Sequence, residues 1–386
     1  MWRSVASNAL TLFIALFLLG GGVLIWGQRQ YTAPGPLTEA ICLRVELGST
    51  MGRVSRQLAS EDAISNPTIF RLGAQYTEKA ALLKAGSFLV QPGASMEEIV
   101  DSVTRGGRST CGTELNFRVG VVSAEVEVRE LDPGTSRYVQ VLSFDPAGDV
   151  PPEYAEFRDQ PDLRFRVTLA EGVTSWQVVE ELKAADFLKG DLAGLPAEGS
   201  IAPDSYEIAE GTARAALIDE MQARQAAILA ALWAERAEGL PLESPEEALI
   251  LASIVEKETG VPQERGQVAS VFVNRLEEGI RLQTDPTVIY GLTRGKEPLG
   301  RGIRQSELRR ETPWNTYVID GLPPTPIANP GRAAIEAALN PEETDYLFFV
   351  ADGTGGHAFA ETLTEHNENV ARWRRIEAER QEQDQK

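Results

Sequence analysis

An uncharged apolar run of 18 residues, residues 9–26, most constrains how this chain folds. A helix of that length just crosses the hydrocarbon core of a bilayer, and Trp26 stands where interfacial aromatic residues are found. We therefore predict a single-pass transmembrane anchor over residues 9–28, preceded by a cytoplasmic segment of residues 1–8. A cleaved signal peptide is the alternative, but the run is long for one and no small-residue cleavage site follows.

Charge and composition limit the partners and the number of domains that the rest of the chain can have. Arg3 before the run and Arg29 after it nearly cancel the positive-inside bias, so charge alone leaves the orientation open. A formal net charge of −20 over 386 residues argues against nucleic acid as a partner and leaves room for two or three domains. The two histidines, His357 and His366, lack a zinc-site spacing, so we predict no metal and no cofactor.

Two cysteines, Cys42 and Cys111, stand at the two ends of the first region after the anchor. In an oxidising compartment they would form one disulfide that closes this region. In the cytosol they would be two buried thiols. The sequence leaves both states open.

A short linker, residues 29–40, leads into a pattern typical of a small β-α-α-β module. Residues 42–47 alternate like a strand, and residues 86–90 return as a second strand. Apolar residues at helical spacing lie between the two strands: Val54, Leu58, Ile69, Leu72 and Tyr76. A further helix over residues 95–104 begins with a Ser-x-x-Glu capping box.

The next segment is rich in alternating valines and in Asp-Pro turn signals. We predict a β-rich insertion over residues 109–162, without a chemical motif, which serves as a spacer or a docking surface. Beyond it, residues 165–188 repeat the strand, turn and helix pattern of residues 43–64, which hints at an internal repeat.

The chemistry is predicted at the end of a buried helix. A Ser-Pro-Glu-Glu sequence at residues 244–247 supplies a cap and an N1 proline, and residues 248–255 are apolar on nearly every side. Glu256-Lys257-Glu258 then places two carboxylates at the helix C-terminus, where the macrodipole disfavours negative charge. A carboxylate that leaves an apolar helix for a cleft is desolvated, so its pKa rises and it retains a proton, as a general acid must.

Helix phase distinguishes the two carboxylates. At about 100° per residue, Glu258 falls nearer the centre of the apolar face than Glu256, and Lys257 points away. Glu258 is therefore the better candidate for the acid, while Glu256 orients it or pairs with a cation. In the alternative interpretation, both glutamates only solvate the helix end.

Polar groups that suit a sugar-binding cleft follow. A second helix, residues 264–278, presents Asn274 and Arg275 near its end, and the loop after it is rich in amides and hydroxyls. The candidates in this loop and the next helix are Gln283, Thr284, Asp285 and Tyr290, although Asp285 alone would also fit an N-cap.

At this point the chain resembles the endolytic murein transglycosylases of the YceG-like family. The motifs are ASIVEKET at residues 252–259, VASVFVNRL at residues 268–276 and LQTDPTVIYG at residues 282–291. Further signatures follow in order: Asn315-Thr316-Tyr317, Gly321-Leu322-Pro323-Pro324, and residues 327–331, 346–351 and 355–359. The resemblance extends over the anchor and the first module, which is similar to the LysM-like domain of the family.

The resemblance implies an α+β fold in several parts. A LysM-like module occupies residues 41–108, a mixed α+β catalytic domain residues 163–372, and a polar C-terminal tail residues 373–386. It further implies a cell inner membrane protein whose catalytic domain lies in the periplasm. Its partners would be peptidoglycan glycan strands, the membrane and cell-wall synthesis enzymes.

Two departures from the family pattern concern the substrate subsites. Residues 200–206, SIAPDSY, keep the Pro-Asp-Ser-Tyr part of a family element, with Asp204 and Tyr206 as candidates, but lose its aromatic lead. The β-rich insertion also looks longer than usual. We therefore expect the subsite contacts there to differ.

The catalytic glutamate of the family is the second one of Glu-Lys-Glu, which corresponds to Glu258. The implied reaction cleaves the β-1,4 bond between N-acetylmuramic acid and N-acetylglucosamine within nascent strands, leaves a 1,6-anhydro end and terminates strand elongation. Gln283, Asn315 and Tyr317 are candidates to stabilise charge on the sugar, and Asp285 is a weaker one. A hydrolytic muramidase and a non-catalytic glycan-binding scaffold remain as alternatives.

Overall fold

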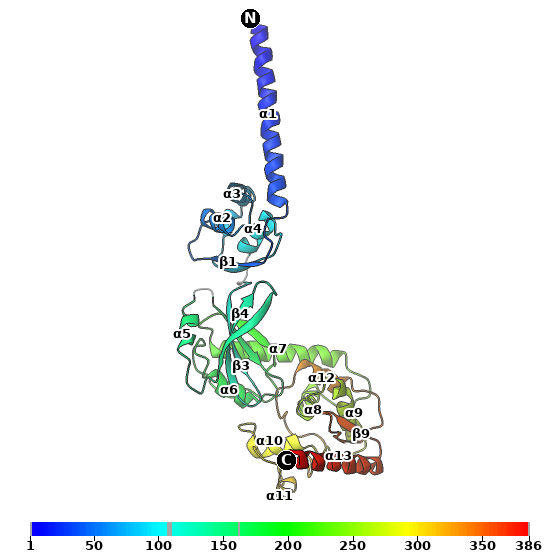
Figure 1. The fold of residues 1–386 in the computed structure, drawn as a ribbon. Helices are drawn as coiled ribbons and strands as arrows, with labels where there is room; N and C mark the ends of the chain where they lie inside the picture. The colour runs from blue at the N-terminus through cyan, green and yellow to red at the C-terminus, as the bar shows by residue number, and fades with distance from the viewer. Residues whose placement is uncertain (1, 106–109, 161–162, 385–386) are drawn as a thin grey trace. The chain divides into compact units, whose positions relative to one another are not determined.

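The computed structural model describes residues 2–105, 110–160 and 163–384, and its secondary structure is α+β, as predicted (Figure 1). The chain divides into two compact units. The first comprises Met1–Leu115, Glu127–Ser143 and Val150–Arg164, and the second comprises Asn116–Val126, Phe144–Asp149 and Phe165–Lys386. Part of the predicted β-rich insertion thus belongs to the same unit as the predicted catalytic residues.

The N-terminal helix α1, Trp2–Thr32, contains the apolar run. In the described part of the chain it is the one helix long and apolar enough to cross a membrane, over Phe13–Thr32, and no residue from 13 to 30 is buried by protein. Phe17 and Leu24, for example, are 73% and 75% exposed. Their apolar surface is left without a protein partner, which is compatible with a lipid environment.

The predicted linker is not a free segment, because it packs against the first module. Helix α1 continues to Thr32, and Tyr31 and Leu37 are only 7% and 8% exposed. The Tyr31 ring lies where a side chain on Gly73 would overlap it, so glycine is required there. Backbone hydrogen bonds from Gly35 N to Gly93 O (3.1 Å) and from Gly93 N to Leu37 O (2.8 Å) fix the residues that follow.

The predicted β-α-α-β order of the first module is confirmed. Its elements are β1 Ile41–Val45, α2 Met51–Ser60, α3 Pro67–Tyr76, the 3₁₀ turn η1 Ala80–Leu82, β2 Gly86–Val90 and α4 Met96–Thr104. Strands β1 and β2 are antiparallel, with Leu43 opposite Phe88. The capping box of α4 is present, because Ser95 Oγ accepts a hydrogen bond from Glu98 N and Ser95 N donates to the Glu98 carboxylate. The likeness to LysM domains stays a prediction.

The apolar stripe predicted for α3 is wrong in part. Phe70 and Ala74 face the core, while Leu72 and Tyr76 are 57% and 91% exposed. Apolar residues occupy two faces of this helix, and periodicity alone does not tell which face is buried.

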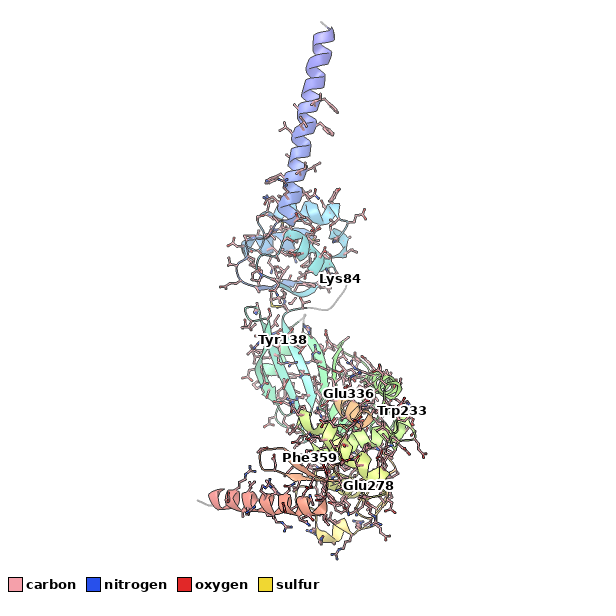
Figure 2. All side chains as sticks on the ribbon, turned by 90° about the vertical axis from the view of Figure 1, so that its right-hand side faces the viewer. Lys84, Tyr138, Trp233, Glu278, Glu336 and Phe359 are labelled. Atoms are coloured by element: carbon pink, nitrogen blue, oxygen red, sulfur yellow. A yellow bond between two sulfur atoms is a disulfide. The ribbon has the colours of Figure 1, made fainter. Side chains whose placement is uncertain are left out.

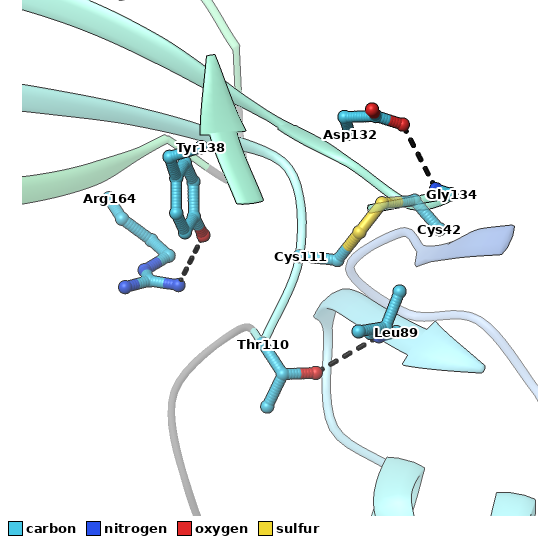
Figure 3. Close-up of a disulfide and its surroundings, with 8 residues drawn as sticks. All are labelled: Cys42, Leu89, Thr110, Cys111, Asp132, Gly134, Tyr138 and Arg164. Carbon is cyan, nitrogen blue, oxygen red and sulfur yellow. Dashed lines mark hydrogen bonds between the residues drawn. A yellow bond between two sulfur atoms is a disulfide. The ribbon is translucent and has the colours of Figure 1, made fainter. Parts of the chain in front are cut away.

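Cys42 and Cys111 form a disulfide with a Cα–Cα distance of 5.8 Å (Figure 3). The neighbouring residue Thr110 accepts a hydrogen bond from Leu89 N at 3.0 Å, which ties the chain after the module back to β2. The disulfide therefore closes the first module. Of the two states that the sequence left open for these cysteines, the structure has the disulfide.

The β-rich segment is part of a larger sheet. Strands β3 Thr113–Val119, β4 Ala124–Asp132, β5 Arg137–Phe144, β6 Arg164–Leu169 and β7 Ser205–Ile208 form one five-stranded sheet in the order β5-β4-β3-β6-β7. A short helix, α5 Glu153–Arg158, precedes β6, and α6 Ser175–Leu182 follows it. Thr174 caps the start of α6 as Thr50 caps the start of α2, so the strand-turn-helix pattern occurs twice.

The second unit is completed by helices and a hairpin. They are α7 Arg214–Ala234, α8 Pro245–Glu258, the 3₁₀ turn η2 Pro262–Glu264, α9 Arg265–Glu277, α10 Asp285–Thr293, α11 Gln305–Leu308, α12 Arg332–Leu339, β8 Phe348–Ala351, β9 His357–Ala360 and α13 Leu363–Asp384. Helices α8, α9 and α12 pack around Leu251, Ile254, Phe272 and Ile335, which are at most 1% exposed. Burial of each such side chain stabilises the fold by about 1.5–3 kcal/mol, so the end of α8 packs on a stable hydrophobic core. The predicted polar tail continues α13.

We expect the disulfide to stabilise the first unit. It closes a loop with a sequence separation of 69 residues, and a loop of that size corresponds to about 4 kcal/mol in the chain-entropy description. Denaturant unfolding of the full chain should show a lower midpoint for the Cys42→Ser/Cys111→Ser variant. A reductant should lower the midpoint of the wild type by the same amount and leave the variant unchanged. A wild-type midpoint that does not respond to reductant would contradict the assignment.

Candidate active site

The helix that carries the predicted acid is held at its start by side-chain caps. Ser244 Oγ accepts a hydrogen bond from Glu247 N at 3.2 Å, and Pro245 occupies the first helical position. The Glu247 carboxylate accepts from Glu243 N (2.7 Å), one residue before the expected capping-box partner. Inside the helix, Ser253 is buried and its hydroxyl accepts from Ile327 N at 3.0 Å. Helix α8 thus reaches Glu258 as a fixed element.

Glu258 is the last residue of α8, and its side chain is partly buried. Burial raises the pKa of its carboxyl, and the nearby charge of Asp285 raises it further. A hydrogen bond donated by Thr284 Oγ1 and the charges of His357 and Arg275 act in the opposite direction. The helix C-terminus also disfavours the carboxylate. Glu258 therefore retains its proton to a higher pH than a glutamate in water does.

Glu256 has a different environment. Its Oε2 accepts a hydrogen bond from Gly331 N at 2.9 Å, and Gly331 is the N-cap residue of α12. Burial raises the pKa of the Glu256 carboxyl, while the charges of Arg265 and Lys257 lower it. Glu256 therefore joins α8 to α12. The interpretation that both glutamates only solvate the helix end is wrong.

Lys257, which we expected to point away from the centre of the apolar face, is nevertheless covered by protein. Its Nζ donates to Gly172 O at 3.2 Å, and burial lowers the pKa of its ammonium group. The loop after β6 covers this side of the helix, which no pattern within α8 reveals. All three residues of the Glu-Lys-Glu sequence are at least partly buried.

The loop before α10 presents Gln283 and Thr284, and Asp285 is the first residue of α10. Gln283 has a φ of 48°, in the left-handed region that non-glycine residues rarely adopt. Hydrogen bonds to Thr316 hold it there, from Gln283 N to the carbonyl oxygen (3.2 Å) and from Thr284 N to the hydroxyl (3.0 Å). Asp285 Oδ1 accepts a hydrogen bond from the Tyr317 hydroxyl at 2.6 Å.

Thr284, not Asp285, is the N-cap residue of α10, yet its side chain does not cap the helix. Its hydroxyl donates to the Glu258 carboxyl instead. An uncapped helix start costs about 1 kcal/mol, so this arrangement gives up local stability to place a hydrogen-bond donor on the acid. Such local costs are typical of functional sites.

Asn274 and Arg275 frame the loop. Arg275 is 8% exposed and donates from Nη1 to Leu282 O at 2.6 Å and from Nε to Leu347 O at 2.7 Å. The Asn274 amide donates to the carbonyls of Thr344 (2.8 Å) and Tyr346 (2.9 Å). These two side chains tie the loop at Leu282 and the segment of residues 344–347 to α9.

Four other candidates bond elsewhere in the unit. The buried Asn315 amide donates to the carbonyls of Glu307, Leu308 and Arg310. The Tyr290 hydroxyl donates to Glu198 Oε2 at 3.1 Å. The Tyr206 hydroxyl donates to Ala202 O (2.8 Å), and Asp204 pairs with Arg224. We predicted from the sequence that these four residues lie at the site with Glu258, but their polar atoms bond to other parts of the fold.

His357 is a further site residue that we did not predict, because the two histidines of the chain lack a zinc-site spacing. Its Nδ1 lies 2.8 Å from Glu264 Oε2, and its backbone N donates to Glu264 Oε1 at 2.9 Å. Gly356 leaves space for this carboxylate, which a Cβ would overlap. The imidazole is near enough to Glu258 for its charge to stabilise the carboxylate. The Gly-Gly-His signature after a strand was the available signal.

The second histidine, His366, stacks on Phe348 at a ring distance of 5.2 Å. Among the residues that the structure describes, no group of three or more His, Cys, Asp or Glu side chains is arranged to hold a metal ion.

We expect Glu258→Gln to stabilise the protein at high pH. The folded state binds the Glu258 proton more tightly than the unfolded chain, so the wild type loses stability as the pH rises from the unfolded pKa through the raised folded pKa. Glutamine cannot ionise. Differential scanning calorimetry should therefore give the variant a higher Tm than the wild type at pH 8, with the difference shrinking toward pH 4.

Glu307→Gln is a control of opposite sign. Its hydrogen bond with Arg301 lowers the pKa of Glu307 to about 2, so its carboxylate adds stability that is lost only as the pH falls toward that value. A Glu258→Gln variant that is less stable than the wild type at pH 8 would contradict a raised pKa at this position.

Comparison with known proteins agrees with the motifs. A sequence model of the YceG-like family matches residues 151–372. The endolytic murein transglycosylase of Bacillus subtilis (strain 168) is 44% identical over 124 residues, which are 32% of this chain and 33% of that protein. The endolytic murein transglycosylase of Streptococcus pneumoniae serotype 2 (strain D39 / NCTC 7466) is 29% identical over 331 residues, 84% of this chain and 56% of that protein. The chain thus matches about a third and about half of the length of these relatives.

Among solved structures, a 2.6 Å crystal structure of a putative yceG-like protein from Listeria monocytogenes aligns with a TM-score of 0.45 and 25% identity. The alignment covers 86% of this chain and 98% of that chain. The family match covers more than half of this chain and includes Glu258, the loop before α10 and His357. The resemblance predicted from the sequence is confirmed, and the chain belongs to the YceG-like family.

Proposed function

We propose that this protein is a membrane-anchored endolytic peptidoglycan lytic transglycosylase whose acid is Glu258. The observation that carries the proposal is the Glu258 carboxyl itself, desolvated at the end of a buried helix and in contact with a hydroxyl donor. The bacterial relatives that bear the name endolytic murein transglycosylase support the same substrate.

The proposed reaction begins with proton transfer. Protonated Glu258 donates to the glycosidic oxygen between N-acetylmuramic acid and N-acetylglucosamine, and the C1–O bond breaks through an oxocarbenium-like transition state. The Glu258 carboxylate then accepts the proton of the C6 hydroxyl of the same N-acetylmuramic acid, whose oxygen bonds to C1. The product is a 1,6-anhydro ring, and Glu258 ends the cycle protonated.

The groups around Glu258 suit its change of charge. In the carboxylate stage, Thr284 donates to it, and the charges of Arg275 and His357 favour it. Before that stage, burial and Asp285 favour the protonated form. The two sets of opposed effects keep the acid able to give and to take a proton. Gln283 and Tyr317 border the same loop and are proposed to contact the sugars.

One buried carboxyl is enough for this chemistry, because the substrate hydroxyl replaces water. Asp285, the acid at the start of α10, is exposed and accepts a hydrogen bond from the Tyr317 hydroxyl. A muramidase that hydrolyses the same bond would need a carboxylate to activate water, and Asp285 is the one beside Thr284. The products distinguish the two reactions.

The proposed location is the inner membrane, with the catalytic domain in the periplasm. Helix α1 is compatible with an anchor, and the Cys42–Cys111 disulfide suits an oxidising compartment. There the enzyme would cut nascent strands internally and so terminate their elongation beside the cell-wall synthesis enzymes. The LysM-like module is proposed to bind the glycan.

We expect Glu258→Gln to reduce cleavage of purified glycan strands by about 10²–10⁴-fold, the usual contribution of a general acid. Glu256→Gln is the matched control, because its amide oxygen can still accept the hydrogen bond from Gly331 N. It should cleave at a rate near that of the wild type. Mass spectrometry of the products measures both the rate and the type of end.

Three outcomes would contradict the proposal. Reducing ends in place of 1,6-anhydro ends would indicate a hydrolytic muramidase. Strand binding without cleavage by the wild type would indicate a glycan-binding scaffold. Loss of activity in Glu256→Gln with retained activity in Glu258→Gln would move the acid to Glu256.

A further inference from the structure

Helix α1 and the first module are packed together. The Tyr31 ring is buried against Gly73 of α3, and α1 contacts both α3 and α4. Leu37 is buried as well, and the backbone hydrogen bonds between residues 35–37 and Gly93 leave no free tether after the helix. The position of α3 relative to the membrane is therefore set by α1.

The geometry of α1 places α3 close to the lipid surface. The apolar run ends at Trp26, and Tyr31 lies five residues later, about 7.5 Å further along the helix axis at 1.5 Å per residue. Helix α3 packs beside Tyr31, and a helix with its side chains is about 10–12 Å wide. Its outer face thus extends back toward the level of Trp26. Figure 1 shows α2 and α3 at the end of the module that α1 enters, and β1 at the other end.

The outer face of α3 carries residues suited to a membrane interface. Phe70 and Ala74 are buried, and the positions about 200° away around the helix are Leu72 and Tyr76, which are 57% and 91% exposed. Tyrosine is enriched at the headgroup level of membranes. Arg71 is also exposed on this helix.

Charge favours the same partner. The chain has a net charge of −20, yet α2 and α3 contain no acidic residue. Their charged residues are all exposed arginines: Arg53, Arg56 and Arg71. Arg53 also pairs with Glu46 at 3.5 Å. Arginine side chains can bury their stems while the guanidinium binds lipid phosphate, and basic residues near an anionic membrane surface are attracted to it.

We propose that the outer face of α2 and α3, formed by Arg53, Arg56, Arg71, Leu72 and Tyr76, lies against the anionic lipid surface of the membrane that α1 crosses. The first module is then seated on the bilayer. This inference rests on the anchoring by α1 that is part of the proposed function, and it adds a second membrane contact that fixes the height of the module.

A nitroxide label tests the contact directly. Both native cysteines are paired, so one introduced cysteine is a unique labelling site. The full oxidised chain is reconstituted in nanodiscs that contain phosphatidylglycerol, and power saturation compares access of oxygen and of a water-soluble nickel complex. The labelled variants are Tyr76→Cys, Lys84→Cys and Leu18→Cys. Lys84 is exposed at the end of the module away from α1 (Figure 2), and Leu18 lies within α1.

We expect loss of nickel access at position 76 relative to position 84, and oxygen-dominated access at position 18. Equal nickel access at positions 76 and 84, with position 18 in lipid, would overturn the seating and leave the anchor intact. Water access at position 18 would remove the anchor and the seating together. Cleavage of soluble glycan strands is measured separately, so loss of the seating is distinguishable from loss of the enzymatic proposal.

A charge reversal tests the role of the arginines. Arg71→Glu, added to the chain labelled at position 76, should restore nickel access there. Lys84→Glu, which changes the charge by the same amount at the far end of the module, should leave position 76 protected. Equal effects of the two substitutions would contradict a contact between Arg71 and anionic lipid.

Discussion

The hydrogen bond from Thr284 to Glu258 is the interaction on which the proposed site depends. It joins the end of α8 to the start of α10. A carboxylate at a helix C-terminus, beside Asp285, is unfavourable unless it is protonated or receives a donor. Thr284 supplies that donor in place of capping its own helix. Two local costs, a buried acid and a helix start without a side-chain cap, thus occur at one point.

The rest of the second unit keeps this pair in place. Arg275 binds the carbonyls of Leu282 and Leu347, and Thr316 holds Gln283 and Thr284. Because these polar groups have partners, the loop is held by specific geometry as well as by apolar packing. Arg275, which the sequence predicted as a substrate contact, is therefore better understood as a positioning residue. Fewer groups are proposed to contact the sugar than the sequence predicted.

Much of the local structure was predictable from the sequence. Ser244 and Pro245 mark the start of α8, and the capping box at Ser95 is present. Helix phase favoured Glu258 over Glu256 as the acid, and burial raises the pKa of the Glu258 carboxyl. These features depend on residues a few positions apart, for which periodicity and caps are direct evidence. The role of Glu258 in catalysis remains a proposal.

Contacts between distant segments were not predictable in this way. Glu256 meets Gly331 and His357 meets Glu264, 75 and 93 residues apart in the chain. Helix α3 has apolar residues on two faces, and only the packing of Tyr31 and the core shows that Phe70 is buried and Tyr76 exposed. A pattern within one element indicates an apolar face but not the segment that covers it.

The most direct measurement is the pKa of the Glu258 carboxyl in the folded protein. Glutamate labelled with ¹³C at the side-chain carboxyl gives one resonance per residue, and the spectrum of Glu258→Gln identifies the signal by its absence. We expect this signal to titrate at a higher pH than glutamate in an unfolded peptide. A titration at or below the peptide value would show an acid that is ionised when the substrate binds, and would contradict the role of Glu258 as the proton donor.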